Sequence, residues 1–304
     1  MKIRVVAVAL MMASFVSSAV AEKKLWGTPQ ACLGQTPPGD TPQAFAKDLL
    51  TDGNGMFAMG RVTFSPDGRE FYYTENDSWK SLEHGAIKEI RYGKHGWEKP
   101  VTLEEKFISP TLSMDGNILY FRQGNMHNVW LAHRSLKGWG MAVEYLDTKF
   151  GVYDYMPTKS GNVYVGTDAG PADKANGSTY VYGLLTGADS STPAVKSLGK
   201  PLNGPGFNGD LFIAPDESYM IVSTNETPTY QSELYIAFRN ADGTWNKPVS
   251  LGAKINDGLA HRWGQYVTPD GKYLFYTRGT SEKDCAVYWV RFDTLLESLR
   301  PKKG

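Results

Sequence analysis

A short turn that recurs along the chain constrains its fold more than any other feature of the sequence. The clearest copy is Ser-Pro-Asp-Gly at residues 65–68, where proline presets φ for the first central position and glycine accepts the positive φ that follows. Related turns end at residues 68, 116, 161, 217 and 271, so neighbouring copies lie 45 to 56 residues apart. A strand of alternating residues follows each turn, as Glu70 to Thr74 follows the first. The chain therefore contains five copies of one supersecondary unit.

The sequence of each of the first four copies predicts four strands. In the first copy a polar loop leads to a third strand at Ala86 to Arg91, and a Gly-Trp turn leads to a weak fourth strand that ends at Leu103. Four strands in about fifty residues are typical of a β-propeller blade, and neighbouring blades must stack because one blade cannot bury both of its faces. A two-layer sandwich is the competing fold, but it does not account for the repeated grouping. We therefore predict an all-β fold, a single β-propeller of five four-stranded blades.

The fifth copy lacks its last strand, because residues 293–300 predict a short C-terminal helix. Phe45 to Thr51 precedes the first blade and could supply the missing strand, which would close the ring and cover an exposed sheet edge. The two cysteines, Cys32 and Cys285, would then flank the same closure. A disulfide between them would strengthen it, and two free buried thiols are the alternative.

Residues 1–21 have the features of a cleaved secretory signal, with Lys2 and Arg4 before an apolar stretch and Ala-Val-Ala at residues 19–21. The apolar stretch is too short to span a bilayer comfortably. We predict a periplasmic or secreted protein with an extended arm over residues 22–44 and a propeller domain over residues 45–304, and we expect a monomer without a membrane span. Lys plus Arg and Asp plus Glu both number 32, so net charge does not favour nucleic acid as a partner.

Three of the repeats resemble the TolB-like propeller repeats of exported bacterial proteins. They are residues 64–74 (FSPDGREFYYT), 212–223 (FIAPDESYMIVS) and 267–277 (VTPDGKYLFYT), and residues 233–256 and 287–302 are also similar to that group. The resemblance covers roughly residues 45–300 and implies a propeller fold. Its motifs are turn and core residues, so it implies no activity. The group is often assigned six blades, which leaves six as the alternative to the five repeats counted here.

One face of the predicted ring is the expected binding face, because the segments that enter each first strand meet there with the loops between second and third strands. The segment 260–266 carries the most varied functional groups. Arg262 could hold a carboxylate through its planar fork, and Trp263 could offer an apolar face. Alternatively, Arg262 pairs with Asp154 or Asp210 and lines a solvated channel. The candidate residues of this face are Arg61, Tyr153, Asp154, Asp210, His261, Arg262, Trp263 and Gln265.

Two functions are consistent with these residues. The first is an exported binding module, without catalysis, that holds a protein partner or a glycan. The alternative is a carbohydrate-active enzyme, either a polysaccharide lyase or a glycoside hydrolase, with His261 as acid or base and Arg262 against a uronate carboxylate. Tyr153 or Asp154 would be the second proton-transfer group of a lyase, and Asp154 with Asp210 would be the carboxylate pair of a hydrolase.

The sequence predicts neither a cofactor nor a metal ion. It contains no His-x-x-x-His or Cys-x-x-Cys spacing of the kind that binds zinc. It also lacks a Gly-x-Ser-x-Gly nucleophile motif, a phosphate-binding loop and a dinucleotide fingerprint.

Overall fold

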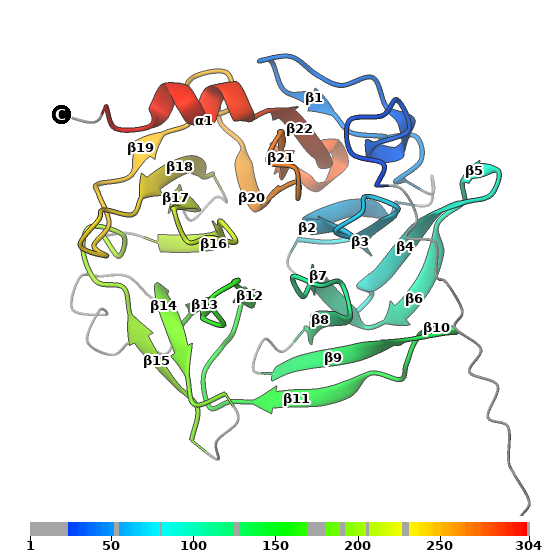
Figure 1. Ribbon diagram of the computed structural model, residues 1–304, viewed down its shortest axis with the longest axis horizontal. Helices are drawn as coiled ribbons and strands as arrows, with labels where there is room; N and C mark the ends of the chain where they lie inside the picture. Colours follow the sequence, from blue (N-terminus) through cyan, green and yellow to red (C-terminus); the bar gives the residue numbers. More distant parts are fainter. Residues whose placement is uncertain are drawn as a thin grey trace, which may run out of the picture.

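The computed structural model is a five-bladed β-propeller whose blades stand around a central axis (Figure 1). It describes residues 24–51, 55–79, 81–124, 128–168, 180–188, 192–204, 207–226 and 231–302, with positions 207, 208, 225 and 226 described by their backbone alone. The signal sequence predicted over residues 1–21 lies outside the described residues. Within these ranges the prediction of five blades is confirmed.

Every blade is an antiparallel sheet whose first strand lies nearest the axis. Blade 1 contains β2 (Phe57–Phe64), β3 (Glu70–Asn76) and β4 (Ala86–Gly93), with β5 (Gly96–Trp97) and β6 (Val101–Glu105) both paired to β4. Blade 2 contains β7 (Phe107–Leu112), β8 (Ile118–Gln123) and β9 (Asn128–Ser135), with β10 (Gly138–Trp139) and β11 (Val143–Asp147) both paired to β9. Blade 3 contains β12 (Met156–Pro157), β13 (Val163–Thr167), β14 (Val181–Thr186) and β15 (Ala194–Ser197). Blade 4 contains β16 (Phe207–Ile213), β17 (Tyr219–Glu226), β18 (Glu233–Phe238) and β19 (Val249–Ser250).

Blade 5 is completed by the N-terminal part of the chain. It contains β20 (His261–Val267), β21 (Tyr273–Gly279), β22 (Ala286–Arg291) and, at its outer edge, β1 (Gln43–Ala44). The chain then ends in the predicted helix, α1 (Asp293–Leu299), and the described residues also include the short 3-10 helices η1 (Cys32–Gly34) and η3 (Glu282–Asp284). None of the helices in the described ranges has the length and apolar character needed to cross a membrane.

The recurring turns hold their shape through local hydrogen bonds. In the first turn, Ser65 Oγ donates to Asp67 Oδ1 at 2.6 Å, and Asp67 Oδ1 accepts from the amide of Arg69 at 3.1 Å. Gly68 has φ 78°, which a residue with a side chain rarely adopts. The pairs Ser113–Asp115 and Thr268–Asp270 repeat the 2.6 Å side-chain bond. These aspartates therefore stabilise their own turns through local hydrogen bonds.

The closing strand lies two residues earlier than the sequence predicts. Gln43 pairs with Trp289 and Ala44 with Tyr288, whereas the prediction placed the strand at Phe45 to Thr51. The Phe45 amide still donates to a carbonyl of β22, but Ala46 has φ 42°, in the left-handed region, and the chain turns away there.

The ring of Phe45 packs between the first and the last blade. Its centroid lies 4.9 Å from that of Phe275, 5.1 Å from that of Trp289 and 5.5 Å from that of Phe71. Closure of the propeller therefore combines backbone pairing with a buried aromatic cluster.

The two cysteines do not form the disulfide that the sequence allowed. Both are free, buried thiols, and burial raises the pKa of each to about 12. Cys32 belongs to the main core, where it lies close enough to Asp270 to feel its charge, at the turn before β21. Cys285 belongs to a separate cluster after the far end of β21. The closure brings both segments to one blade, but it leaves the thiols at opposite ends of a seven-residue strand.

Candidate functional site

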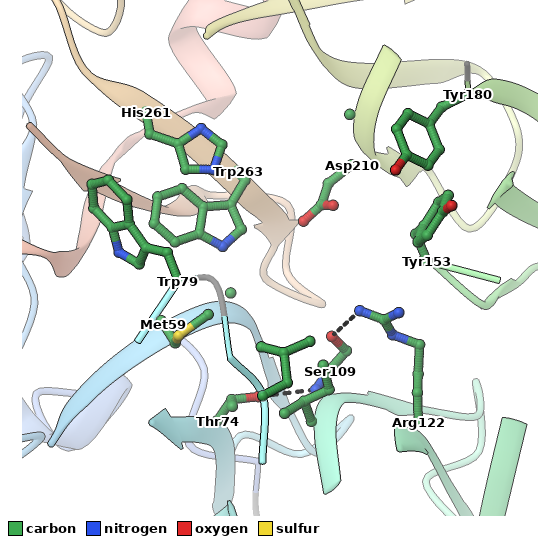
Figure 2. Close-up of a pocket in the computed structure, with 14 residues that line it drawn as sticks. Met59, Thr74, Trp79, Ser109, Arg122, Tyr153, Tyr180, Asp210, His261 and Trp263 are labelled. Atoms are coloured by element: carbon green, nitrogen blue, oxygen red, sulfur yellow. Dashed lines mark hydrogen bonds between the residues drawn. The ribbon is translucent and has the colours of Figure 1, made fainter. Parts of the chain in front are cut away.

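A cavity of about 210 Å³ lies at one end of the propeller axis, and all five blades or the loops that join their strands contribute to its wall (Figure 2). The cavity is on the face that the sequence predicted as the binding face. Small-molecule pockets commonly have volumes of about 300–1,000 Å³, so this cavity has room for one small ring and not for an extended ligand.

Bulges in the inner strands bring polar groups to this cavity. In β7, β16 and β20, two consecutive residues oppose one residue of the neighbouring strand, at 109–110, 209–210 and 264–265. A bulge bends the strand and turns a side chain away from its regular direction. Ser109 has φ 59°, which is uncommon for a residue other than glycine. At the bulge of β20 only glycine fits, because a Cβ on Gly264 would collide with the backbone of Gly60.

Aromatic rings form one wall of the cavity. The rings of His261 and Trp263 are stacked, with centroids 4.0 Å apart and an interplanar angle of 24°. Trp79 packs edge-on against Trp263, at 5.5 Å and 78°. Burial lowers the pKa of His261 to about 3, so its imidazole is neutral at pH 7. His261 therefore supports the indole of Trp263 and is a poor base for proton transfer.

Two tyrosines contribute to another part of the wall. The rings of Tyr153 and Tyr180 meet at 4.5 Å and an angle of 76°. Burial, followed by the hydrogen bond with Tyr180, raises the pKa of Tyr153 above its usual value, so its hydroxyl stays protonated at neutral pH. Tyr153 was predicted from the sequence as part of the binding face, and this placement is consistent with that.

Asp210 brings a carboxylate to the cavity from the bulge of β16 (Figure 2). Its Oδ2 accepts a hydrogen bond from the amide of Gly264 at 2.8 Å. Burial, followed by the negative charge of Asp154, raises the pKa of Asp210 from 3.8 to about 7, against the opposing effect of Arg61 and Arg122. The protonated and ionised forms of Asp210 are therefore both populated near neutral pH.

Arg122, at the end of β8, also lines the cavity, and the sequence interpretation missed it. Its side chain is 8% exposed and donates two long hydrogen bonds, from Nη1 to Val152 O and from Nη2 to Ser109 Oγ, both at 3.3 Å. The Nε atom is buried without a partner. Among the described residues, no carboxylate oxygen lies within 4.0 Å of its guanidinium nitrogens. Within the described part of the chain, Arg122 is thus a buried cation without an ion pair.

Arg61 and Asp154 pair with each other beneath the cavity and do not line it. Arg61 Nη2 lies 2.5 Å from Asp154 Oδ1 and donates to Leu211 O at 2.6 Å, while Asp154 Oδ2 accepts from the Leu211 amide at 2.8 Å. Their exposed fractions are only 2% and 3%. Gln265, fully buried nearby, donates to the carbonyl oxygens of Asp210 and Ile221. These three predicted site residues are therefore structural supports of the axis.

Arg262 is directed away from the cavity, which corrects both roles that the sequence suggested for it. Its Nε donates to Ile255 O at 2.8 Å and its Nη1 to Ser232 O at 3.0 Å, and its ion pair is with Asp257 at 3.2 Å. Successive side chains of a strand point to opposite sides. Since Trp263 faces the cavity, its neighbour Arg262 cannot, and it instead stabilises the loop before β20.

The structure therefore brings together Tyr153, Asp210, His261 and Trp263 from the predicted set, and it adds Arg122, Trp79 and Tyr180. A second cavity, of about 310 Å³, lies at the other end of the axis, and Arg61 reaches its wall. In the described part of the chain, no group of three or more His, Cys, Asp or Glu side chains could hold a metal ion.

No protein-family model matches this chain, and no curated protein matches it either. Among solved structures it is similar to a thermostable family-43 glycoside hydrolase, with 16% identity, 83% of this chain and 90% of that chain covered, and a TM-score of 0.48. It is also similar to a putative TolB from Agrobacterium tumefaciens, with 15% identity, 77% of each chain covered and a TM-score of 0.44. It is similar as well to a prolyl endopeptidase, with 13% identity, 81% of this chain and 41% of that chain covered, and a TM-score of 0.40. This chain therefore spans less than half of that protein's length. At these identities the likeness is one of fold alone.

Proposed function

We propose that this chain is an exported sugar-binding module that takes one ring of a glycan into the cavity without cleaving it. The observation that carries the proposal is the indole of Trp263, held in place by His261 and Trp79, in the same cavity as the carboxylate of Asp210. The C–H face of a sugar ring packs on an aromatic ring, while its hydroxyls donate to a carboxylate. An aromatic wall and a recessed acceptor in one small cavity suit such a ligand.

A glycan fits this site better than a protein partner does. Stable protein interfaces bury about 1,600 Å² over roughly 20–30 residues on each side. Here the chemically distinctive groups lie inside a cavity of about 210 Å³ instead of on a broad surface. The export predicted from residues 1–21 would place the cavity among periplasmic or extracellular glycans.

The geometry favours binding over the enzymatic alternative. Most glycoside hydrolases use two carboxyl groups that flank the scissile bond, and Asp210 is the one carboxylate in the described wall of the cavity. Asp154, the second candidate, is occupied by Arg61. The lyase alternative required His261 as a base and Arg262 against the substrate, and neither side chain is suited to that role.

Saturation-transfer difference NMR with a panel of neutral and acidic monosaccharides and disaccharides would test the proposal, because it detects weak binding. We expect signals from at least one sugar with the wild-type protein and their loss in Trp263→Ala. Trp245→Ala is the matched control, because Trp245 lies on the outer part of blade 4, where it pairs with Arg239. Equal binding by the two variants, or no binding by the folded wild type, would contradict the proposal. Release of shorter sugars during the measurement would show that the protein cleaves its ligand, which would contradict binding without catalysis.

A further inference from the structure

The five repeats share one buried position, and blade 2 departs from the others there. This position is the sixth residue after the last residue of each recurring turn, near the end of the second strand. Four repeats have a small hydroxyl residue, and the second repeat has an arginine. In repeat order the residues are Thr74, Arg122, Thr167, Ser223 and Thr277.

In the four regular blades the hydroxyl bonds to the backbone of an inner-strand segment. Thr74 Oγ1 accepts from the Ser109 amide at 2.9 Å, and Thr277 Oγ1 donates to Gly60 O, also at 2.9 Å. The hydroxyls of Thr167 and Ser223 each donate to a backbone carbonyl at 2.6 Å. A hydroxyl is therefore sufficient for the structural task of this position.

The arginine of blade 2 performs the structural task less well than a hydroxyl. Its bond to the Val152 carbonyl, in the segment that enters blade 3, is 3.3 Å long, and its Nε has no hydrogen-bond partner among the residues that the structure describes. A buried charge without a counterion is costly, so an arginine retained for stability alone would be expected to have a carboxylate beside it. Arg122 has none within 4.0 Å among the described residues. Its guanidinium instead reaches the wall of the cavity.

The side chains around the cavity indicate which kind of ligand group would pair with the Arg122 guanidinium. Figure 2 shows the Asp210 carboxylate beside the indole of Trp263, with Arg122 on the other side of it and lower in the view. A sugar ring against Trp263 would direct hydroxyls toward Asp210 and a ring substituent toward Arg122. A planar guanidinium fork matches a carboxylate, to which it can donate two parallel hydrogen bonds.

We propose that Arg122 makes this cavity selective for a sugar ring that carries a carboxylate, that is, a uronate residue. The inference rests on the proposed sugar-binding function and names its ligand class. Arg122 donates hydrogen bonds to the carboxylate, Trp263 packs against the sugar ring, and Asp210 accepts a hydrogen bond from a sugar hydroxyl. The neutral hexose of the same stereochemistry retains the contacts with Trp263 and Asp210 and lacks the contact with Arg122.

Matched pairs of ligands distinguish the proposed binding of a sugar from the proposed preference for a uronate. The first pair of probes is the methyl glycoside of glucuronic acid, with its carboxylate free, and the methyl glycoside of glucose. The second pair is the methyl glycoside of galacturonic acid and that of galactose, and each probe is titrated by NMR. A hydrogen bond to a charged group contributes about 1.5–3 kcal/mol, so for the better pair we expect the uronate to bind about 10–100-fold more tightly than its neutral partner. Arg122→Thr, which restores the residue type of the other repeats, should remove this preference and leave the affinity for the neutral sugar within about twofold, because only the carboxylate contact is lost.

The controls keep the outcome clear. Arg291→Thr makes the same chemical change at a half-exposed side chain in blade 5 and should keep the preference. If Arg122→Thr does not fold, Arg122→Met keeps the apolar stem without the charge and should lose the preference in the same way. Equal binding of uronate and neutral sugar by the wild type, or a preference that survives in the Arg122 variants, would overturn the uronate inference while sugar binding stands. Failure of the wild type to bind either member of both pairs would instead count against the sugar-binding function itself.

Discussion

Asp210 is expected to lower the stability of the folded protein at neutral pH. Its folded-state pKa of about 7 lies above its ordinary value of 3.8, because burial and the charge of Asp154 disfavour the ionised form. The unfolded chain therefore releases this proton near pH 4, whereas the folded chain retains it to about pH 7. The stability associated with Asp210 is fully present below pH 4 and is lost as the pH rises through 7.

The size of this effect follows from the two pKa values. One pKa unit between the folded and unfolded states corresponds to about 1.36 kcal/mol, and the rise from 3.8 to about 7 therefore sets an upper limit of about 4 kcal/mol at pH 8. Asp210→Asn removes the ionisation, and its side-chain oxygen can still accept from the Gly264 amide. Relative to the wild type, we expect this variant to gain stability steadily between pH 4 and 7 and to remain more stable above pH 7.

Urea denaturation of both proteins at pH values from 4 to 8 measures the difference directly. Asp115→Asn is the control, because hydrogen bonds from Ser113 and Asn117 lower the pKa of this turn residue below 3.8, so its difference in stability from the wild type should stay nearly constant over this pH range. If the free energies of unfolding of Asp210→Asn and the wild type keep a constant difference across the range, the pKa of Asp210 is not raised. The electrostatic description of the cavity would then be refuted.

Two further predictions concern the framework beneath and beside the cavity. Asp154→Ala leaves the Arg61 guanidinium buried without its carboxylate and should reduce the free energy of unfolding by about 3–5 kcal/mol, whereas Asp40→Ala, which removes an exposed ion pair, should leave it almost unchanged. Phe45→Ala should cost about 3–5 kcal/mol, because the ring fills the space between the first and last blades. Chemical denaturation measures each change. Leu49→Ala, at an exposed residue of the same segment, is the control for Phe45→Ala. A loss of stability in Leu49→Ala as large as that in Phe45→Ala would contradict the role of Phe45 in ring closure.

The fold could be predicted from the sequence because its turns are local structures. A turn such as residues 65–68 is specified by its own proline, aspartate and glycine, and five copies at similar spacing leave few alternatives to a propeller. The exact closing strand was not predicted, because the positive φ at Ala46 and the burial of Phe45 are set by packing against other blades. The choice between a disulfide and two free thiols stayed open for a related reason, since the sequence places Cys32 and Cys285 on one blade but does not say at which end of it each lies.

The site was predicted in part because strand alternation and bulges decide which side chains reach the axis. Trp263 and His261 lie two residues apart and face the cavity together, while Arg262 between them faces away. Arg122 was missed because it ends an apolar strand and was read as part of the sheet. Comparison of the sixth position after each turn would have found it, since the other repeats carry a hydroxyl residue there.

The buried charges around the axis differ in how well the fold satisfies them, and this difference separates support from recognition. Arg61 and Asp154 neutralise each other at 2.5 Å and share the backbone of Leu211, so they have little capacity left for a ligand. Arg122 and Asp210 lie in the same region but lack a partner of opposite charge within ion-pair distance among the described residues. In the proposed function a ligand offers Arg122 a carboxylate and Asp210 a hydroxyl donor, and buried polar groups of this kind discriminate between ligands. In the proposed function, Arg122 and Asp210 recognise the ligand, whereas Arg61 and Asp154 support the fold.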